Sequence, residues 1–143
     1  MNDIRILITG GSGFIGTNAM NYCISNQWQV KNIDIEPPKE KSHLKYWAKV
    51  DICDYKALSS AIYDFNPTHI LHLAAKTGMD LKSLDEVPAN IEGVKNIIEI
   101  SNKLADLKRV LFTSSLLVCK NGYIPKDDMD YCPPNIYGQS KMM

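Results

Sequence analysis

The segment from Ile4 to Gly16 constrains the fold of this chain more than any other. It reads IRILITGGSGFIG, an apolar run that ends in three glycines spaced G-x-x-G-x-x-G, and a helix-like pattern follows at once. A strand that turns directly into a helix exposes unpaired N–H groups and a positive dipole end, which bind phosphate. Gly10 would permit the tight turn, Gly13 would let the backbone approach a pyrophosphate, and Gly16 would let the helix pack on the strand. The segment predicts a dinucleotide-binding βαβ unit.

An acidic residue follows at the distance that this interpretation requires. Asp34 stands 18 positions after Gly16, within a second apolar stretch at 30–35. A carboxylate there lies beside the adenosine ribose, where it accepts hydrogen bonds from the hydroxyls and repels a 2′-phosphate. We therefore expect NAD as the cofactor rather than NADP. The alternative is an aspartate at a strand end that only caps a turn.

Size and charge exclude several classes of protein. The chain has 143 residues, enough for one domain with a core, and its formal net charge is zero. No basic surface indicates nucleic acid or an anionic membrane, and no apolar run reaches the length of a membrane span. The N-terminus lacks the layout of a signal peptide. We expect a cytoplasmic protein with neither a nucleic-acid nor a membrane partner.

The cysteines and histidines predict no metal site. Cys23, Cys53, Cys119 and Cys132 form no C-x-x-C pair and show no metal-ligand spacing with the histidines. Reduced thiols in a cytosolic protein are expected, with Cys23 in the core of the first helix. His72, at a strand end, could be a base or a ligand, but a packed histidine is favoured because no partner ligand is suitably spaced.

Strand and helix patterns alternate along the chain. They predict strands at 4–9, 30–35, 46–50, 69–73 and 109–114, and helices at 14–26, 55–65 and 88–104, with a further helix from about Asn135. The almost wholly apolar runs at 6–8 and 110–112 fit strands that are buried on both faces. Phe14, Ile15, Ala19 and Cys23 would form the apolar side of the first helix, and Asp54 would cap the second. This alternation predicts an α/β fold, a Rossmann-type doubly wound parallel sheet with helices on both faces and a ligand crevice at the carboxyl ends of the strands. Because the chain stops inside the last helical pattern, we expect the fold to be incomplete at the C-terminus.

A possible catalytic group follows the fifth predicted strand. Tyr137 and Lys141 form a Y-x-x-x-K pair, which on a helix shares one face, and the ammonium would favour the phenolate. Such a phenol can exchange a proton with a sugar hydroxyl while hydride moves to or from a nicotinamide. Ser115 could hold the reacting oxygen. Each signal alone is weak: the pair could be a solvated helical pair, and the serine a turn residue.

Several motifs in this order resemble one known family. The chain is similar over all 143 residues to the extended short-chain dehydrogenase/reductases, in particular the NAD-dependent nucleotide-sugar epimerase/dehydratase group. The motifs that carry this resemblance are TGGSGFIG at 9–16, Asp51-Ile52, HLAA at 72–75, Asn90-x-x-Gly93, Thr113-Ser114-Ser115 with Val118, and the Tyr137/Lys141 pair.

The resemblance implies roles for individual residues. The catalytic residues would be Ser115, Tyr137 and Lys141. With the positions argued above, the expected NAD contacts come from Gly10, Gly13, Phe14, Ile15, Gly16, Asp34, Ile35, Asp51, Ile52, Leu73, Ala74, Ala75, Lys76, Asn90, Thr113, Tyr137 and Lys141. For Lys76 an exposed lysine is the alternative. The substrate would be a UDP-, dTDP- or GDP-sugar, and the full-length protein a homodimer.

Two features depart from the family pattern. Where the family has V-Y-G after the serine, this chain has Val118-Cys119-Lys120, so Cys119 is either a reactive thiol or a small apolar substitute. Family members also continue for about as many residues again with a substrate-binding domain. We therefore expect residues 1–143 to be a truncated NAD-binding domain that lacks this C-terminal domain and is weak or inactive alone.

The leading functional hypothesis is an NAD-dependent epimerase or dehydratase acting on a nucleotide sugar. One alternative is an NAD-binding module without turnover, such as a redox-sensing subunit. Another is an NAD(P)-dependent ketone reductase, which Asp34 disfavours because those relatives usually prefer NADP.

Overall fold

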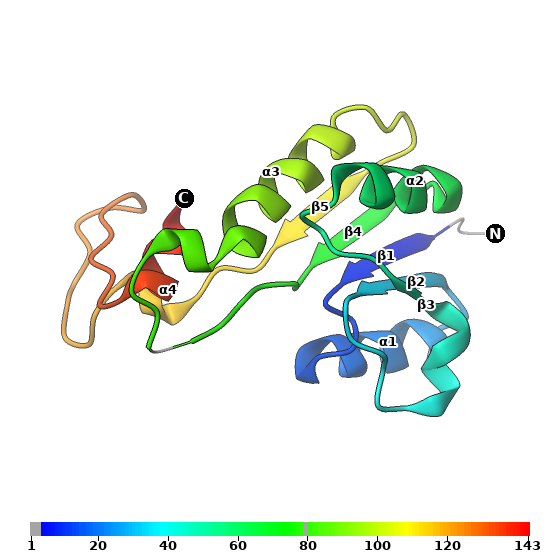
Figure 1. Cartoon of the computed structure of the whole chain (residues 1–143), viewed down its shortest axis with the longest axis horizontal. Coiled ribbons are helices and arrows are strands. Elements are labelled where there is room, and N and C mark those ends of the chain that lie inside the picture. Colours follow the sequence, from blue (N-terminus) through cyan, green and yellow to red (C-terminus); the bar gives the residue numbers. More distant parts are fainter. Residues whose placement is uncertain (1–3, 79) are drawn as a thin grey trace.

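The computed structural model describes residues 4–78 and 80–143 of the chain. Among these residues, five strands form one sheet in the order β3-β2-β1-β4-β5, and every neighbouring pair is parallel (Figure 1). The strand order reverses between β1 and β4, where a doubly wound sheet opens a crevice at its carboxyl ends. The predicted Rossmann-type sheet is confirmed. Its strands are β1 (Arg5–Thr9), β2 (Gln29–Asp34), β3 (Trp47–Lys49), β4 (His69–His72) and β5 (Arg109–Phe112).

Helices cover both faces of the sheet, as predicted. Figure 1 shows α1 on one face, α2 and α3 on the other, and α4 beyond the carboxyl ends of the strands. The α-helices are α1 (Phe14–Ser25), α2 (Tyr55–Phe65), α3 (Pro88–Ser101) and α4 (Ile136–Met142), and short 3-10 helices occur at η1 (Lys41–Tyr46), η2 (Leu84–Glu86) and η3 (Leu116–Val118).

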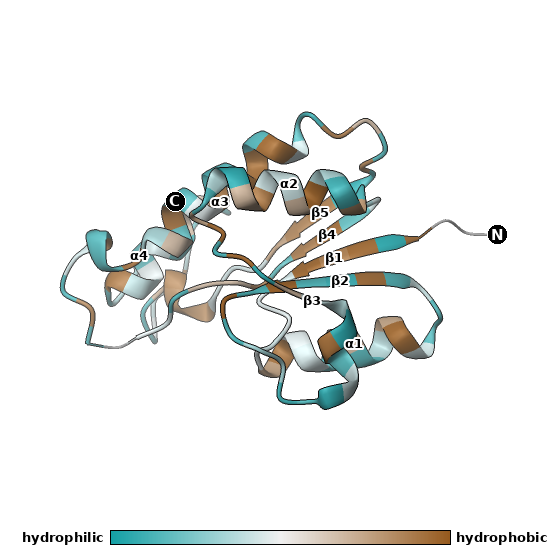
Figure 2. Cartoon of the chain, turned by 45° about the vertical axis from the view of Figure 1, so that its right-hand side comes forward, coloured by the Kyte–Doolittle hydropathy of each residue, from teal (hydrophilic) through white to brown (hydrophobic). Residues whose placement is uncertain are grey.

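The hydrophobic core has two layers, one on each face of the sheet. Consecutive residues of a strand point to opposite faces. Leu7 of β1 therefore packs in one cluster with Leu58 of α2 and Ile97 of α3, while Ile8 packs with Met20 of α1. All five are fully buried, each contributing about 1.5–3 kcal/mol. Figure 2 shows hydrophobic segments of β1, β4 and β5 between the helices of the two faces. This core holds the carboxyl ends of the strands in register.

Strand β5 departs from the prediction that the apolar strands are buried on both faces. Leu111 and Phe112 remain 55% and 44% exposed. Because β5 is the last strand in the sheet order, its outer edge has no neighbouring strand among the described residues. The apolar run at 110–112 correctly predicted a strand, but the prediction that this strand is buried on both faces was wrong.

The predicted apolar side of α1 was also partly wrong. Phe14 and Ile15 are exposed, whereas Gly16, Met20 and Cys23 are the buried residues of this helix. The helix packs through Gly16 on the turn that follows β1, and the two residues before Gly16 are left exposed. Cys23 is in the core as predicted, and burial raises the pKa of its thiol.

Most element boundaries lie within a few residues of the prediction. α2 matches 55–65, and its predicted cap is confirmed because Asp54 accepts a hydrogen bond from the Ala57 N–H at 3.1 Å. α3 starts at Pro88 as predicted but ends at Ser101. The strand predicted at 46–50 is shorter in the structure and spans 47–49, because Tyr46 is the last residue of η1. No clear pattern in the sequence indicates η1.

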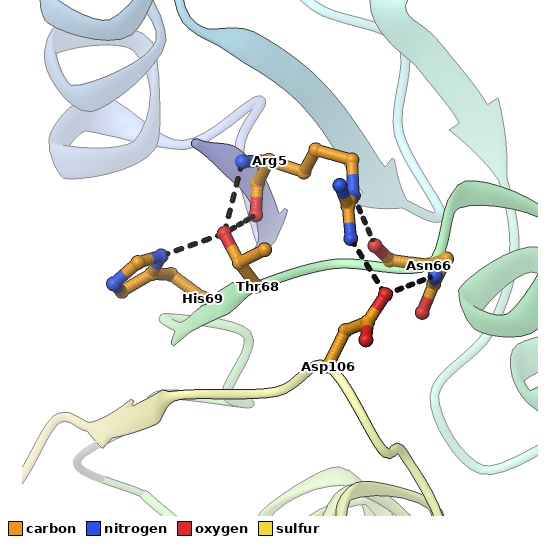
Figure 3. A network of polar contacts seen from close by, with 5 residues as sticks. All are labelled: Arg5, Asn66, Thr68, His69 and Asp106. Carbon is orange, nitrogen blue, oxygen red and sulfur yellow. Dashed lines mark hydrogen bonds and ion pairs between the residues drawn. The ribbon is translucent and has the colours of Figure 1, made fainter. Parts of the chain in front are cut away.

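A polar network closes the amino end of the sheet (Figure 3). The Arg5 N–H donates to Thr68 Oγ1 at 3.0 Å, and the Arg5 guanidinium pairs with Asp106 at 3.1 Å. Asn66 donates to the same carboxylate at 2.9 Å, and Thr68 Oγ1 lies 2.9 Å from His69 Nδ1. The network ties β1 to the segments that precede β4 and β5. Because this network lies at the end of the sheet opposite the predicted crevice, we assign it a structural role.

Candidate functional site

The turn between β1 and α1 is tightly enclosed. Gly10 has a φ of 74°, and a β-carbon there would lie 2.7 Å from the Ala74 nitrogen. Its own N–H donates to the Ile33 carbonyl at 2.9 Å. The turn is thus fixed between the end of β2 and the segment after β4, and only glycine fits at its first position.

The other two glycines serve the helix start. Gly13 caps α1 without a side-chain acceptor, and its missing side chain leaves the first N–H groups of the helix open. A β-carbon on Gly16 would lie 2.2 Å from the Gly10 carbonyl oxygen and 2.5 Å from the Gly11 α-carbon. Gly16 therefore packs on the turn itself rather than on the strand, which corrects the sequence-based role. Together the three glycines form a cradle that side chains would fill.

A cavity of about 1050 Å³ opens over this turn. Ligand sites commonly occupy about 300–1,000 Å³, so the cavity has room for a large ligand such as a dinucleotide. The predicted cofactor residues that line it are Gly10, Gly13, Phe14, Asp34, Ile35, Asp51, Ile52, Leu73, Ala74, Ala75 and Lys76. Those that do not line it are Ile15, Gly16, Asn90, Thr113, Tyr137 and Lys141.

Sequence reasoning missed part of the cavity wall. Ser12, Thr17 and Asn18 line it from the turn and from α1, and Lys39 and Glu40 line it from the loop after Asp34. The first three lie within or just after the glycine motif, so its spacing could have indicated them. The loop after Asp34 carries no motif, and only the fold brings it to the cavity.

Asp34 lies at the end of β2 on the cavity wall. One carboxylate oxygen accepts the Ser12 N–H at 3.0 Å, and the other accepts the Glu36 N–H at 3.0 Å. Asp34 therefore stabilises a turn, which was the alternative to the ribose contact. Each carboxylate oxygen can accept a further hydrogen bond, so the same group can also meet a ribose hydroxyl.

Asn90 lies behind the cavity rather than in its wall. It is 4% exposed, and its side-chain amide pairs with both the N–H and the carbonyl of Lys76, at 2.7 and 3.0 Å. It also donates to Ser140 Oγ at 2.8 Å, and that hydroxyl donates to the Tyr137 carbonyl at 2.8 Å. Asn90 therefore joins the loop after β4 to α4. A direct cofactor contact from Asn90 stays a prediction.

Helix α4 carries the predicted tyrosine and lysine, as expected. Lys141 is half-buried, and its ammonium donates to the Thr113 carbonyl at 2.9 Å, which anchors the helix to the end of β5. Burial lowers the pKa of Lys141. Within the described chain, the Tyr137 hydroxyl has no hydrogen-bond partner. It is thus free to meet a substrate oxygen.

Ser115 lies on an element that packs against α4. Its hydroxyl caps η3 by accepting the Leu117 N–H at 3.1 Å. A β-carbon on Gly138 would lie 2.0 Å from the Leu117 carbonyl oxygen, so α4 approaches η3 closely beside the tyrosine. The structure thus brings the elements that carry Ser115, Tyr137 and Lys141 together, but no hydrogen bond joins Ser115 to Tyr137 among the described residues.

His72 is a packed residue at the end of β4. Its side chain is 2% exposed, and Nδ1 lies 2.7 Å from Thr9 Oγ1, which also accepts the Ala74 N–H at 3.3 Å. Burial, followed by the charge of Lys141, lowers the pKa of His72 to about 4. The favoured interpretation of His72 as a packed histidine is confirmed. Its role is to hold the ends of β1 and β4 together.

The described residues contain no group of three or more His, Cys, Asp and Glu side chains placed to hold a metal ion. In the same part of the chain, no helix has both the length and the apolar character needed to cross a membrane.

Comparison with known proteins places these features in a family. The sequence profile of the "NAD dependent epimerase/dehydratase family" matches residues 6–143. The N-acetyl-alpha-D-glucosaminyl-diphospho-ditrans,octacis-undecaprenol 4-epimerase of Escherichia coli O157:H7 is 30% identical over 146 aligned positions, covering 99% of this chain and 41% of that protein. The dTDP-glucose 4,6-dehydratase of Haemophilus influenzae is 33% identical over 111 aligned residues, which cover 68% of this chain and 33% of that protein.

Solved structures show the same arrangement. The Bordetella bronchiseptica enzyme WbmG in complex with NAD superposes with a TM-score of 0.82 at 29% sequence identity, covering 99% of this chain and 47% of WbmG. The chain thus spans between a third and a half of the length of these three proteins.

Proposed function

Because the chain belongs to the NAD-dependent epimerase/dehydratase family, we propose that it is the NAD-binding domain of an enzyme acting on nucleotide sugars. The diphosphate would rest on the N–H groups that follow Gly10 and Gly13, including those of Phe14 and Ile15. The adenosine ribose would meet Asp34, and the adenine would lie near Asp51 and Ile52, with Ile35 beside it. The single observation that carries this proposal is the cavity over the enclosed glycine turn.

The far half of the cofactor would extend along the segment after β4. Leu73, Ala74 and Ala75 are small or apolar residues of that cavity wall, and Lys76 follows them. The nicotinamide end would then point towards Thr113 and α4. Asn90 would act by holding the Lys76 backbone in place, as its two hydrogen bonds indicate.

The chemistry would take place beside α4. When bound, NAD supplies a hydride acceptor at the sugar carbon. The Tyr137 phenolate would take the proton from the sugar hydroxyl and become a phenol, and the nearby Lys141 ammonium would favour the phenolate that this step needs. Ser115 would hold the reacting oxygen with its hydroxyl. The Lys141 hydrogen bond to Thr113 would keep the ammonium in position.

The substrate would be a UDP-, dTDP- or GDP-sugar, and the full-length protein a cytoplasmic homodimer. The similarity to a dTDP-glucose 4,6-dehydratase supports a nucleotide sugar as substrate. The similarity to the undecaprenol 4-epimerase supports a diphosphate-linked sugar more generally, because its named substrate carries a polyprenol in place of a nucleoside. Neither relative fixes the base or the sugar carbon.

The proposed activity is tested with a panel of UDP-, dTDP- and GDP-sugars. We expect the full-length gene product to convert at least one of them without net consumption of NAD, as monitored by sugar NMR and NADH absorbance. If the protein binds NAD but converts none of these sugars, the result would instead favour an NAD-binding module without turnover. Net oxidation of NADPH by small ketones would favour the reductase.

Asp34 gives a separate prediction about cofactor choice. The variant Asp34→Asn keeps one of the two side-chain oxygens that accept N–H groups of the turn, and it loses the charge that repels a 2′-phosphate. We expect NAD affinity to fall by a factor of about 10 to 150, since hydrogen bonds to charged groups contribute about 1.5–3 kcal/mol. NADP affinity should rise. Titration calorimetry with both cofactors measures this change.

The matched control is Asp54→Asn, at the cap of α2, away from the cavity lining. It should leave both affinities unchanged. An unaltered ratio of NAD to NADP affinity in Asp34→Asn would contradict the ribose contact.

A further inference from the structure

Two cysteines face each other in the segment that joins the serine to the tyrosine. Cys119 and Cys132 form an isolated parallel β-bridge. The Cys132 N–H donates to the Val118 carbonyl at 3.0 Å, and the Lys120 N–H donates to the Cys132 carbonyl at 2.8 Å. Neither thiol is bonded to another cysteine. Residues far apart in the sequence therefore meet through this one bridge.

The bridge gives the two cysteines a spacing that suits a disulfide. Neighbouring strands lie about 4.8 Å apart, and paired residues project from the same face. Disulfides span α-carbon separations of about 4.4–6.8 Å. The Cys119 thiol already points towards the segment that carries Cys132, because its sulfur contacts the Asp130 carbonyl at 3.8 Å. The bridge therefore holds the two backbones at a separation that a disulfide can span.

The surroundings leave this pair accessible. Both cysteines are partly exposed, unlike Cys23. The loop between them turns on Tyr123, whose hydroxyl donates to the Asp130 carboxylate at 2.6 Å. That loop extends to one side of α4, away from the sheet (Figure 1). The two cysteines are therefore more open to a small disulfide reagent than Cys23 is.

We propose that Cys119 and Cys132 are a redox-responsive dithiol pair, which closes to a disulfide across the segment between Ser115 and α4. The pair lies where the sequence departs from the family pattern, since Cys119 takes the position of the family's tyrosine. The inference rests on the bridge alone and does not depend on NAD binding or turnover.

The oxidant would be a low-molecular-weight disulfide such as glutathione disulfide. The thiolate of one cysteine attacks it, forms a mixed disulfide and releases one glutathione thiolate. The second cysteine thiolate then attacks the protein sulfur of that mixed disulfide and releases the second glutathione. The two thiol protons end on the two glutathione thiols, so one disulfide is reduced and one is formed.

The test treats the folded chain with glutathione disulfide, quenches it with acid, digests it with trypsin and maps the linked peptides. Trypsin cuts after Lys120 and Lys126, so the disulfide would join peptide 110–120 to peptide 127–141. We expect this linked species and the loss of two of the chain's four thiols in a thiol titration. Reduction should separate the two peptides.

Cysteine variants distinguish a specific Cys119–Cys132 disulfide from general reactivity of the thiols. Cys119→Ser and Cys132→Ser should each abolish the linked peptides, whereas Cys53→Ser, which removes a partly exposed cysteine elsewhere, should leave them unchanged. In urea, which removes the bridge, the 119–132 linkage should form more slowly than in the folded chain. Separate glutathione adducts on Cys119 and Cys132 in the folded chain, or linkage to Cys53, would overturn the proposal.

Discussion

Replacing Tyr137 by phenylalanine is expected to lower the turnover of the full-length gene product by a factor of about 10²–10⁴, the range that a positioned acid–base group contributes. The variant removes only the hydroxyl, which has no partner among the described residues, so α4 should keep its packing. NAD affinity should change less than about twofold, because the cavity over the glycine turn does not include this side chain. Steady-state kinetics and calorimetry on one preparation measure both quantities.

A tyrosine elsewhere provides the matched control. Tyr63 on α2 is 43% exposed and far along the chain from the site, so Tyr63→Phe should leave turnover unchanged. Lys141→Met should lower turnover as strongly as Tyr137→Phe, although it also removes the hydrogen bond to Thr113. Full turnover in Tyr137→Phe would remove the tyrosine from the proposed mechanism.

The second large effect is expected at Gly16. In Gly16→Ala the new β-carbon would lie 2.2 Å from a backbone oxygen and 2.5 Å from a backbone carbon, so the turn or the helix must shift. Overpacking typically costs about 1–3 kcal/mol, and a clash with backbone atoms falls at the upper end of this range or beyond it. We expect a loss of about 3 kcal/mol in urea unfolding and at least a hundredfold loss of NAD affinity.

Gly13→Ala separates binding from folding. Its β-carbon would meet one protein atom, the Gly10 oxygen, at an ordinary 3.4 Å, and the residue has a φ of −74° that alanine adopts readily. The free energy of unfolding should therefore change little, while the methyl group at the cavity wall should weaken NAD binding. A normal NAD affinity in both glycine variants would show that the turn does not hold the diphosphate.

The parts of the fold that were predictable are those fixed by neighbours in sequence. The glycine spacing predicted the turn and the start of α1, and Asp54 predicted the start of α2, because caps and turns depend on a few adjacent residues. The alternation of elements then predicted the parallel sheet. Asp34 reached the cavity wall because the end of β2 lies beside the turn in any such sheet.

Features set by distant partners were not predictable. The sequence did not reveal that the Asn90 amide bonds to Lys76 and to Ser140, which is 50 positions away in the sequence. The bridge between Cys119 and Cys132 depends on how the loop between them folds back, and no local pattern specifies it. Exposure of Leu111 depends on what lies beside the edge strand rather than on the strand itself.

Titration calorimetry of NAD into the folded wild-type chain tests the central claim most directly. We expect saturable binding of one NAD per chain, weaker binding of NADP, and a clear loss of NAD affinity in Gly13→Ala at unchanged stability. A folded chain that gives no binding signal with either NAD or NADP would contradict the account.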